Sequence, residues 1–165
     1  SDLMESQTRN LTLWFVLIAI GYVAYAAIFI FQSSFVVAGE RFFTLFDDAM
    51  ISMRYARNLA DGFGLVWNPG EGPVEGYSNF LWLLTAAVGI FLGLEPLQFT
   101  QAAGLVAQAV TLWALFQIGR AAGRRGWKAT LAPLFLAGSI SFLAYPMTGM
   151  ETSLFCCLLT VAFLF

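Results

Sequence analysis

The chain has 165 residues, of which 59% are hydrophobic and only 11% are charged, and its formal net charge is −2. An ordinary soluble domain is about 45–50% apolar and about 25% charged, so this composition indicates a membrane protein. The lack of histidine excludes a histidine base and a Ser-His-Asp triad, and the lack of a basic arm argues against nucleic-acid binding. The two cysteines, Cys156 and Cys157, are neighbours inside an apolar run, which fits neither a disulfide framework nor a zinc site.

The first apolar segment predicts a membrane-spanning helix over residues 11–31. This segment carries no charge, and about 20 apolar residues suffice to cross a hydrocarbon core about 30 Å thick. The run is too long for a secretory signal peptide, and no small-residue cleavage site follows promptly. We therefore expect a retained anchor, preceded by a short cytoplasmic tail at residues 1–10.

A long polar segment follows, at residues 32–95. It holds seven acidic residues and three arginines, so we expect it to be an extracytoplasmic loop. Residues 48–61 predict an amphipathic helix at the membrane surface, ended by the glycines at 62 and 64. The side expected to face the membrane consists of Ile51, Met53, Tyr55, Ala56 and Leu59.

Residues 79–94 predict a second interfacial helix. Its 16 residues would reach only about 24 Å, which is short for a crossing. A crossing there would also place the acidic loop on the same side as the basic loop at 120–128, whereas an interfacial position keeps the two loops on opposite sides. Asn79 begins this helix, and Trp82 is the expected aromatic anchor.

Two further apolar runs, 96–119 and 129–146, predict the second and third membrane-spanning helices. Short basic loops normally stay in the cytoplasm, and the loop at 120–128 contains Arg120, Arg124, Arg125 and Lys128. The third span then leads to a second extracytoplasmic loop at 147–152. Residues 153–165 are expected to be the start of a truncated fourth span, so the fold class is an all-α multi-pass membrane protein.

Carboxylates of the two external loops are the first candidates for chemistry, because charge is costly in so apolar a chain. The expected topology puts Glu151 on the same face as Asp47 and Asp48. Helix capping alone would explain an acidic pair at a helix start. Capping needs only one carboxylate, however, and two neighbours hinder each other's ionisation, which can make one a useful base. The three are also weak candidate ligands for Mg²⁺ or Mn²⁺.

Other polar residues of the loops are candidates for substrate binding. Arg54 and Arg57 fit either lipid-headgroup contacts or a phosphate clamp, since guanidinium groups bind phosphate oxygens bidentately. Glu75 and Tyr77 come directly before the second interfacial helix. Glu151 fits either a charge near a helix N-terminus or a site residue.

The run DDAMISMRYARNLADGFGLVWNPGEGPVEGYSNFLW at 47–82, followed by TGMET at 148–152, resembles the membrane-embedded C-type (GT-C) glycosyltransferases. The chain most resembles the bacterial arabinofuranosyltransferase-like branch, and the resemblance covers most of residues 40–155. It implies membrane helices around a cavity at the outer face of the bacterial cytoplasmic membrane, with a large first external loop that carries interfacial helices. Enzymes of this group are much longer, so we expect this chain to be the amino-terminal portion of such an enzyme and to be inactive by itself.

The resemblance also implies the chemistry: an inverting transfer of a sugar from a polyprenyl-phosphate carrier to an acceptor hydroxyl on a glycan, lipid or protein of the cell envelope. By matching position, one acid of the Asp47–Asp48 pair is the base, with Asp47 preferred and Asp48 its orienting partner. Glu151 matches the second acidic motif, near the donor phosphate or a metal. Arg54, Arg57 or a divalent cation would neutralise the leaving phosphate.

Two other interpretations stay open. The first is a non-catalytic membrane subunit or scaffold of a cell-envelope complex that kept the loop pattern. The second is a transporter, whose carboxylates would lie in mid-membrane and relay ions. The position of Asp47 and Asp48 beyond the first span argues against a transporter.

Overall fold

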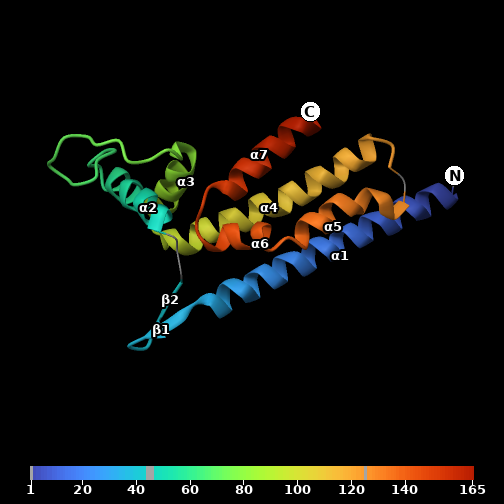
Figure 1. Ribbon diagram of the computed structural model, residues 1–165, viewed down its shortest axis with the longest axis horizontal. Coiled ribbons are helices and arrows are strands. Elements are labelled where there is room, and N and C mark those ends of the chain that lie inside the picture. The colour runs from blue at the N-terminus through green and yellow to red at the C-terminus, as the bar shows by residue number, and fades with distance from the viewer. Residues whose placement is uncertain (1, 44–46, 125) are drawn as a thin grey trace.

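The computed structural model describes residues 2–43, 47–124 and 126–165, with side chains from Thr12 onward except at positions 47, 126 and 147. The fold is mostly helical, at 71%. In chain order the elements are α1 (Asp2–Ser33), β1 (Phe35–Val37), β2 (Glu40–Phe42), α2 (Asp47–Ala60), α3 (Phe80–Phe91), α4 (Pro96–Ala121), the 3₁₀ helix η1 (Gly126–Thr130), α5 (Leu131–Ala137), α6 (Ile140–Met147) and α7 (Thr152–Leu164) (Figure 1).

Two described helices are long and apolar enough to cross a membrane. They are α1, over Thr12–Ser33, and α4, over Pro96–Ala121. Both coincide with segments in which the sequence predicts a span, 11–31 and 96–119. The outward side chains of α1 include Trp14, 63% exposed, and Ile20, 61% exposed. A lipid environment suits such an apolar surface.

The third predicted span is not one straight helix. Trp127–Ala137 and Ile140–Pro146 satisfy the length and composition requirement only together, and they meet at an angle of 63°. The break falls at Gly138–Ser139, where Ser139 takes an extended backbone with ψ of 122°. A Gly/Ser pair is a common cause of a sharp helix kink. With the bent pair counted as one span, the described chain has three candidate crossings.

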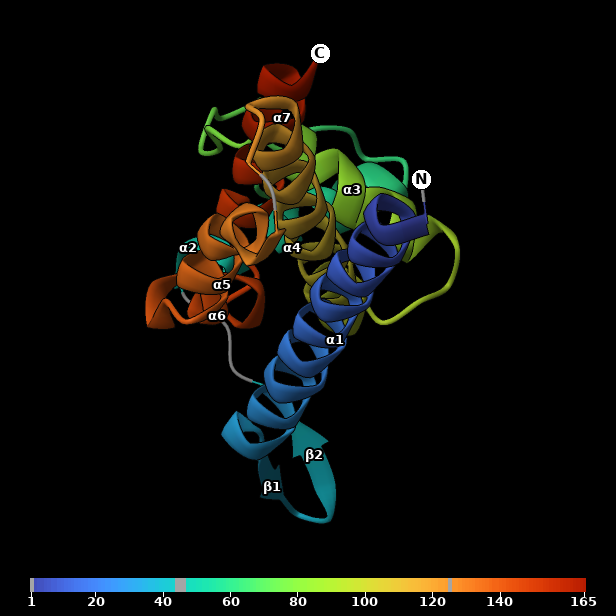
Figure 2. The ribbon, with the colours of Figure 1, turned by 90° about the vertical axis from the view of Figure 1, so that its right-hand side faces the viewer.

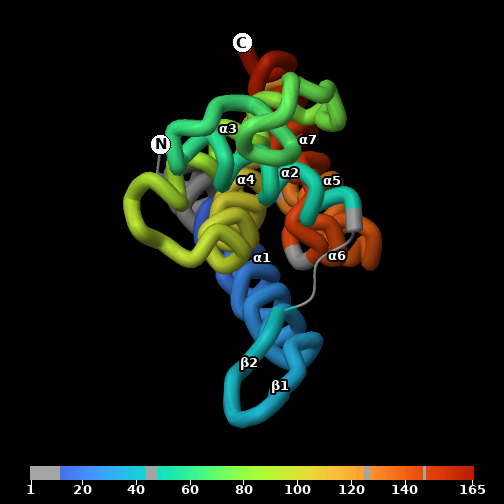
Figure 3. Tube along the Cα trace, turned by 90° about the vertical axis from the view of Figure 1, so that its left-hand side faces the viewer, coloured from blue at the N-terminus to red at the C-terminus, as the bar shows by residue number. Residues whose placement is uncertain are grey.

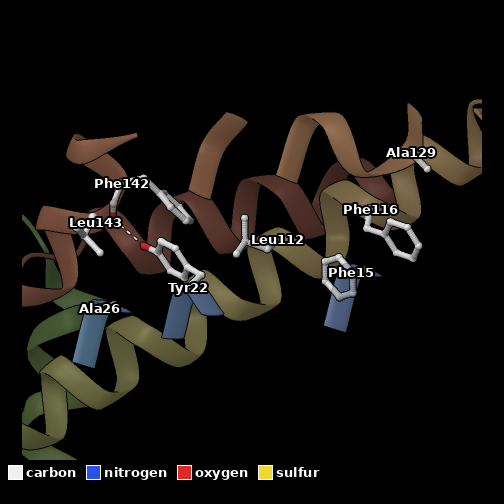
Figure 4. Close-up of a cluster of buried hydrophobic side chains, with 8 residues drawn as sticks. All are labelled: Phe15, Tyr22, Ala26, Leu112, Phe116, Ala129, Phe142 and Leu143. Atoms are coloured by element: carbon white, nitrogen blue, oxygen red, sulfur yellow. Dashed lines mark hydrogen bonds between the residues drawn. The ribbon is translucent and has the colours of Figure 1, made fainter. Parts of the chain in front are cut away.

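The helices α1, α4 and α6 share one hydrophobic core. Phe15 of α1 stacks on Phe116 of α4 at 4.7 Å between ring centroids, and Tyr22 lies 5.5 Å from the ring of Phe142. Figure 4 shows these side chains converging between the helices. At Gly104 the backbones of α4 and α6 come so close that an added Cβ would lie 3.0 Å from Cβ of Pro146.

A β-hairpin after α1 departs from the predicted all-α fold. Strands β1 and β2 pair antiparallel with Phe35 opposite Phe42. The turn residues Ala38 and Gly39 have positive φ angles of 52° and 86°, as a two-residue hairpin turn requires, since such turns match the twist of the strands. The hairpin extends beyond the end of α1, away from the other helices (Figures 1 and 2).

The helix α2 is amphipathic as predicted, but its apolar side packs against a neighbouring helix. The sequence predicts that this side faces the membrane, whereas in the structure it packs against α3. Tyr55 and Ala56 of α2 join Leu83 and Ala86 of α3 in a second core. The helix α3 in turn crosses α4, where an added Cβ on Gly89 would meet the ring of Phe99 at 2.4 Å. Figure 3 shows α2 and α3 together at the end where α4 begins.

Candidate functional site

A pocket of about 270 Å³ forms where three separate segments meet. The helix α2 contributes Asp48 and Ser52, the loop before α3 contributes residues 76–79, and the turn before α7 contributes Met150 and Glu151. We call this the polar pocket. The two acidic motifs of the sequence, far apart along the chain, thus line one cavity.

Side-chain hydrogen bonds join the three walls of the polar pocket. Ser52 Oγ donates to Asn79 Oδ1 at 2.9 Å, and Asn79 Nδ2 donates to Glu151 Oε2 at 3.0 Å. Beside this network, Trp82 Nε1 donates to the carbonyl of Gly149 at 2.7 Å, and the Trp82 side chain is buried. The turn that carries Glu151 is therefore held against α3 from both directions.

The loop that carries Tyr77 rests on α2 through Tyr55. The Tyr55 hydroxyl donates to the carbonyl of Val74 at 2.6 Å, and the ring of Tyr77 meets that of Tyr55 edge-on at 4.9 Å. Gly76 approaches so closely that an added Cβ would lie 2.8 Å from the Tyr55 hydroxyl. This packing gives Tyr77, which is half-buried and lines the polar pocket, a fixed position.

An apolar groove of about 600 Å³ adjoins the polar pocket. The two cavities share three lining residues, Ser78, Asn79 and Glu151. The rest of the groove lies between the start of α3 and the start of α7, and its apolar lining consists of Phe80, Leu81, Trp82, Leu154, Phe155 and Leu158. A polar head and an apolar chain of one molecule could therefore lie side by side across this junction.

The structure brings together only some of the predicted site residues. Asp48, Tyr77 and Glu151 line the polar pocket. Glu75 is exposed and lies outside the lining of both cavities. The side chain of Asp47, the predicted base, lies outside the described residues, so its role stays a prediction.

Arg54 contacts a loop of its own chain. Its Nε donates to the carbonyl of Trp67 at 2.9 Å, its Nη2 donates to Asn68 Oδ1 at 2.5 Å, and its guanidinium group lies 4.2 Å from the Trp67 ring centroid. Asn58 donates to the same carbonyl at 3.1 Å. Arg57 is exposed, and neither arginine lines the two cavities. The phosphate clamp predicted for these arginines stays a prediction.

Ser52 and Asn79 belong to the site but were not predicted as site residues from the sequence. Ser52 follows Asp48 by one helical turn, which places both on one side of α2. That spacing was a usable signal for Ser52. The bond from Asn79 to Glu151 spans 72 positions, and nothing local in the sequence indicates it.

Asp48 and Glu151 are the predicted metal ligands that line the polar pocket. Among the described residues, no three histidine, cysteine or acidic side chains come together. Mg²⁺ is commonly held by one or two carboxylates together with substrate phosphates. A divalent cation at these two carboxylates stays a prediction.

Comparison of the chain with protein-family models, with curated proteins and with solved structures finds no match. The function is therefore argued from the site and from the sequence motifs that form it.

Proposed function

We propose that the protein is a membrane-embedded glycosyltransferase of the C-type that takes its sugar from a polyprenyl-phosphate carrier. The observation that carries the proposal is the wall shared by the polar pocket and the apolar groove, formed by Ser78, Asn79 and Glu151. A polyprenyl-phosphate sugar has a charged head joined to a long apolar chain, and it needs a junction of this kind. The motifs that resemble the family lie on both sides of that junction.

In the proposed reaction, a carboxylate of the Asp47–Asp48 pair removes the proton from the acceptor hydroxyl. The acceptor oxygen forms a bond to the anomeric carbon, and the bond from that carbon to the phosphate oxygen breaks from the opposite side. The phosphate leaves with the electron pair of the broken bond, and attack on the face opposite to it inverts the anomeric centre. Glu151, held by Asn79, lies at the junction where the leaving phosphate would lie. A bound Mg²⁺ or Mn²⁺ would supply charge neutralisation there.

The proposed membrane position follows from the charges of the loops. The polar pocket would lie at the outer face of the bacterial cytoplasmic membrane, and the basic segment 120–128 would lie in the cytoplasm. Acceptors would be glycans, lipids or proteins of the cell envelope. This topology keeps the base and the lipid-linked donor at one membrane surface.

The proposal is tested by sugar transfer in membranes that contain the full-length protein, with a mixed pool of labelled polyprenyl-phosphate sugars. Asp47→Asn, Asp48→Asn and Glu151→Gln are measured separately, and Asp61→Asn is the matched control. Asp61 is an exposed residue just beyond α2 and outside both cavities. Loss of the general base is expected to reduce turnover by about 100-fold or more, with Asp61→Asn unchanged.

Two results would overturn this function. The first is no transfer by the unsubstituted full-length protein from any donor in the pool. The second is native turnover in all three carboxylate variants. Either result would favour the alternative of a non-catalytic membrane subunit or scaffold, for which the carboxylates are dispensable.

A further inference from the structure

We propose that the basic end of the molecule holds a binding site for the headgroup of an anionic phospholipid. The site is a cavity of about 530 Å³ between the last turns of α4 and the segment η1–α5. It lies at the opposite end of α4 from α2 and α3 (Figure 1). It shares no lining residue with the polar pocket or the apolar groove, so the inference does not depend on the proposed catalysis.

The charge of this cavity selects an anion. Its lining contains Arg124 and Lys128, both exposed, and no acidic residue. The sequence between Glu95 and Glu151 has no aspartate or glutamate at all. In a chain whose net charge is −2, all the charged side chains of this segment are therefore positive. Basic pockets between membrane helices are sites at which anionic lipid headgroups bind.

The walls of the cavity favour a lipid over a free phosphate ion. Leu115 and Ile118 of α4 and Leu131 of α5 line it beside the two cations. A phosphate ion would leave these apolar side chains unused, whereas the glycerol and first acyl carbons of a phospholipid would cover them. Gly119 lets η1 approach α4 closely beside the cavity, since an added Cβ there would lie 3.2 Å from the carbonyl oxygen of Ala129.

Trp127 indicates how deep the site lies in the membrane, and its fluorescence can report which lipid is bound there. Its side chain lines the cavity and is 65% exposed. Tryptophan is enriched at the membrane–water interface, the level at which headgroups lie. A lipid bound by Arg124 and Lys128 would bring its acyl chains next to the Trp127 indole.

The test measures which lipid lies next to Trp127. The chain is reconstituted in vesicles of phosphatidylcholine and phosphatidylglycerol, with bromine, which quenches tryptophan, on the acyl chains of one lipid at a time at equal mole fraction. The quenching at Trp127 is obtained by subtracting the fluorescence lost in Trp127→Phe from the fluorescence lost in the native chain. Two basic residues are expected to enrich the anionic lipid by about 30-fold at low ionic strength, and added salt should weaken the enrichment.

The double variant Arg124→Gln/Lys128→Gln should lose the preference for brominated phosphatidylglycerol while its helical circular dichroism stays native. Arg124→Lys, which keeps the charge, should retain it, and Arg41→Gln, in strand β2 of the distant hairpin, should not alter it. Equal quenching by both lipids, or a preference that survives in the double variant, overturns the proposal. Loss of the preference on addition of inorganic phosphate, but not of sodium chloride at the same ionic strength, would assign the site to phosphate alone and overturn the lipid assignment.

Discussion

Asn79 occupies its place in the polar pocket because one amide group both donates and accepts. Its oxygen accepts from Ser52 and its nitrogen donates to Glu151. In Asn79→Asp the bond from Ser52 survives, but a carboxylate oxygen replaces the donor 3.0 Å from Glu151 Oε2. We expect a loss of about 1–2 kcal/mol in the free energy of unfolding, because the pair is only part-buried.

The pH dependence separates charge repulsion from simple loss of packing. Two facing carboxylates repel least when one of them holds a proton, so the stability lost in Asn79→Asp is full at neutral pH and shrinks as the pH falls. Thermal unfolding in detergent at neutral and mildly acidic pH measures it. The matched control is Asn68→Asp, whose amide donates to Glu71 Oε2 at 2.8 Å on the exposed surface. The control should change stability by less than about 0.5 kcal/mol, and equal losses in both variants would contradict the argument.

Individual residues differ in how far the sequence alone could predict them. Asp48 and Glu151 stand out because carboxylates are rare in an apolar chain, and both line the polar pocket. Arg54 stands out equally, but its donors bind the loop at Trp67 and Asn68. Charge alone could not predict this, because the acceptors are a backbone carbonyl and an amide brought near by the fold.

Among the helices, the polar cluster of Tyr22, Gln108 and Phe142 joins α1, α4 and α6. Pro146 has no N–H group, so the carbonyl of Phe142, four residues earlier, has no helical donor. Gln108 Nε2 of α4 donates to that carbonyl instead, and the Tyr22 hydroxyl donates to Gln108 Oε1 at 2.6 Å. The side chain of Gln108 is fully buried. A proline on one helix is thus matched by a glutamine on its neighbour.

This match predicts a coupling between two substitutions. Gln108→Leu leaves the Phe142 carbonyl with only a long contact of 3.3 Å from the Tyr22 hydroxyl, and should cost about 1–3 kcal/mol. Pro146→Ala restores the missing N–H, so the cost of Gln108→Leu should be smaller in that background by at least about 0.5 kcal/mol. Unfolding by denaturing detergent in mixed micelles measures the cycle. Strictly additive losses would show that the glutamine does not serve this carbonyl.

Hydropathy predicted the helices that need only length and apolar composition. The span in α1 and the helix α4 follow from their uncharged runs. The same pattern could not locate the bend at Gly138–Ser139, because the run stays apolar on both sides of it. The periodicity of α2 predicted its apolar side, but periodicity does not distinguish lipid from α3 as the surface that this side covers.

At the scale of the whole molecule, contacts with α4 show how far the bent pair of helices, Trp127–Ala137 and Ile140–Pro146, extends across the membrane. Gly119 of α4 lies against Ala129 at the start of the pair, and Gly104 lies against Pro146 at its end. Gly104 and Gly119 are fifteen positions apart, which corresponds to about 22 Å along α4 at 1.5 Å per residue. The pair therefore runs along most of the height of α4 despite its 63° bend. This geometry favours a broken span over a re-entrant loop that returns to the side on which it began.

A broken span puts the turn before α7 and the basic loop on opposite sides of the membrane. In a background with Cys156→Ala and Cys157→Ala, we expect Thr148→Cys and Glu71→Cys to react with a membrane-impermeant maleimide from one side, and Arg124→Cys only from the other. Right-side-out and inverted vesicles give the two sides. Labelling of Thr148→Cys together with Arg124→Cys would establish a re-entrant loop instead. A re-entrant loop would place Glu151 and Asp48 on opposite sides of the membrane. The hydrogen bond from Asn79 to Glu151 at 3.0 Å requires them on the same side, so that result would contradict the fold described here.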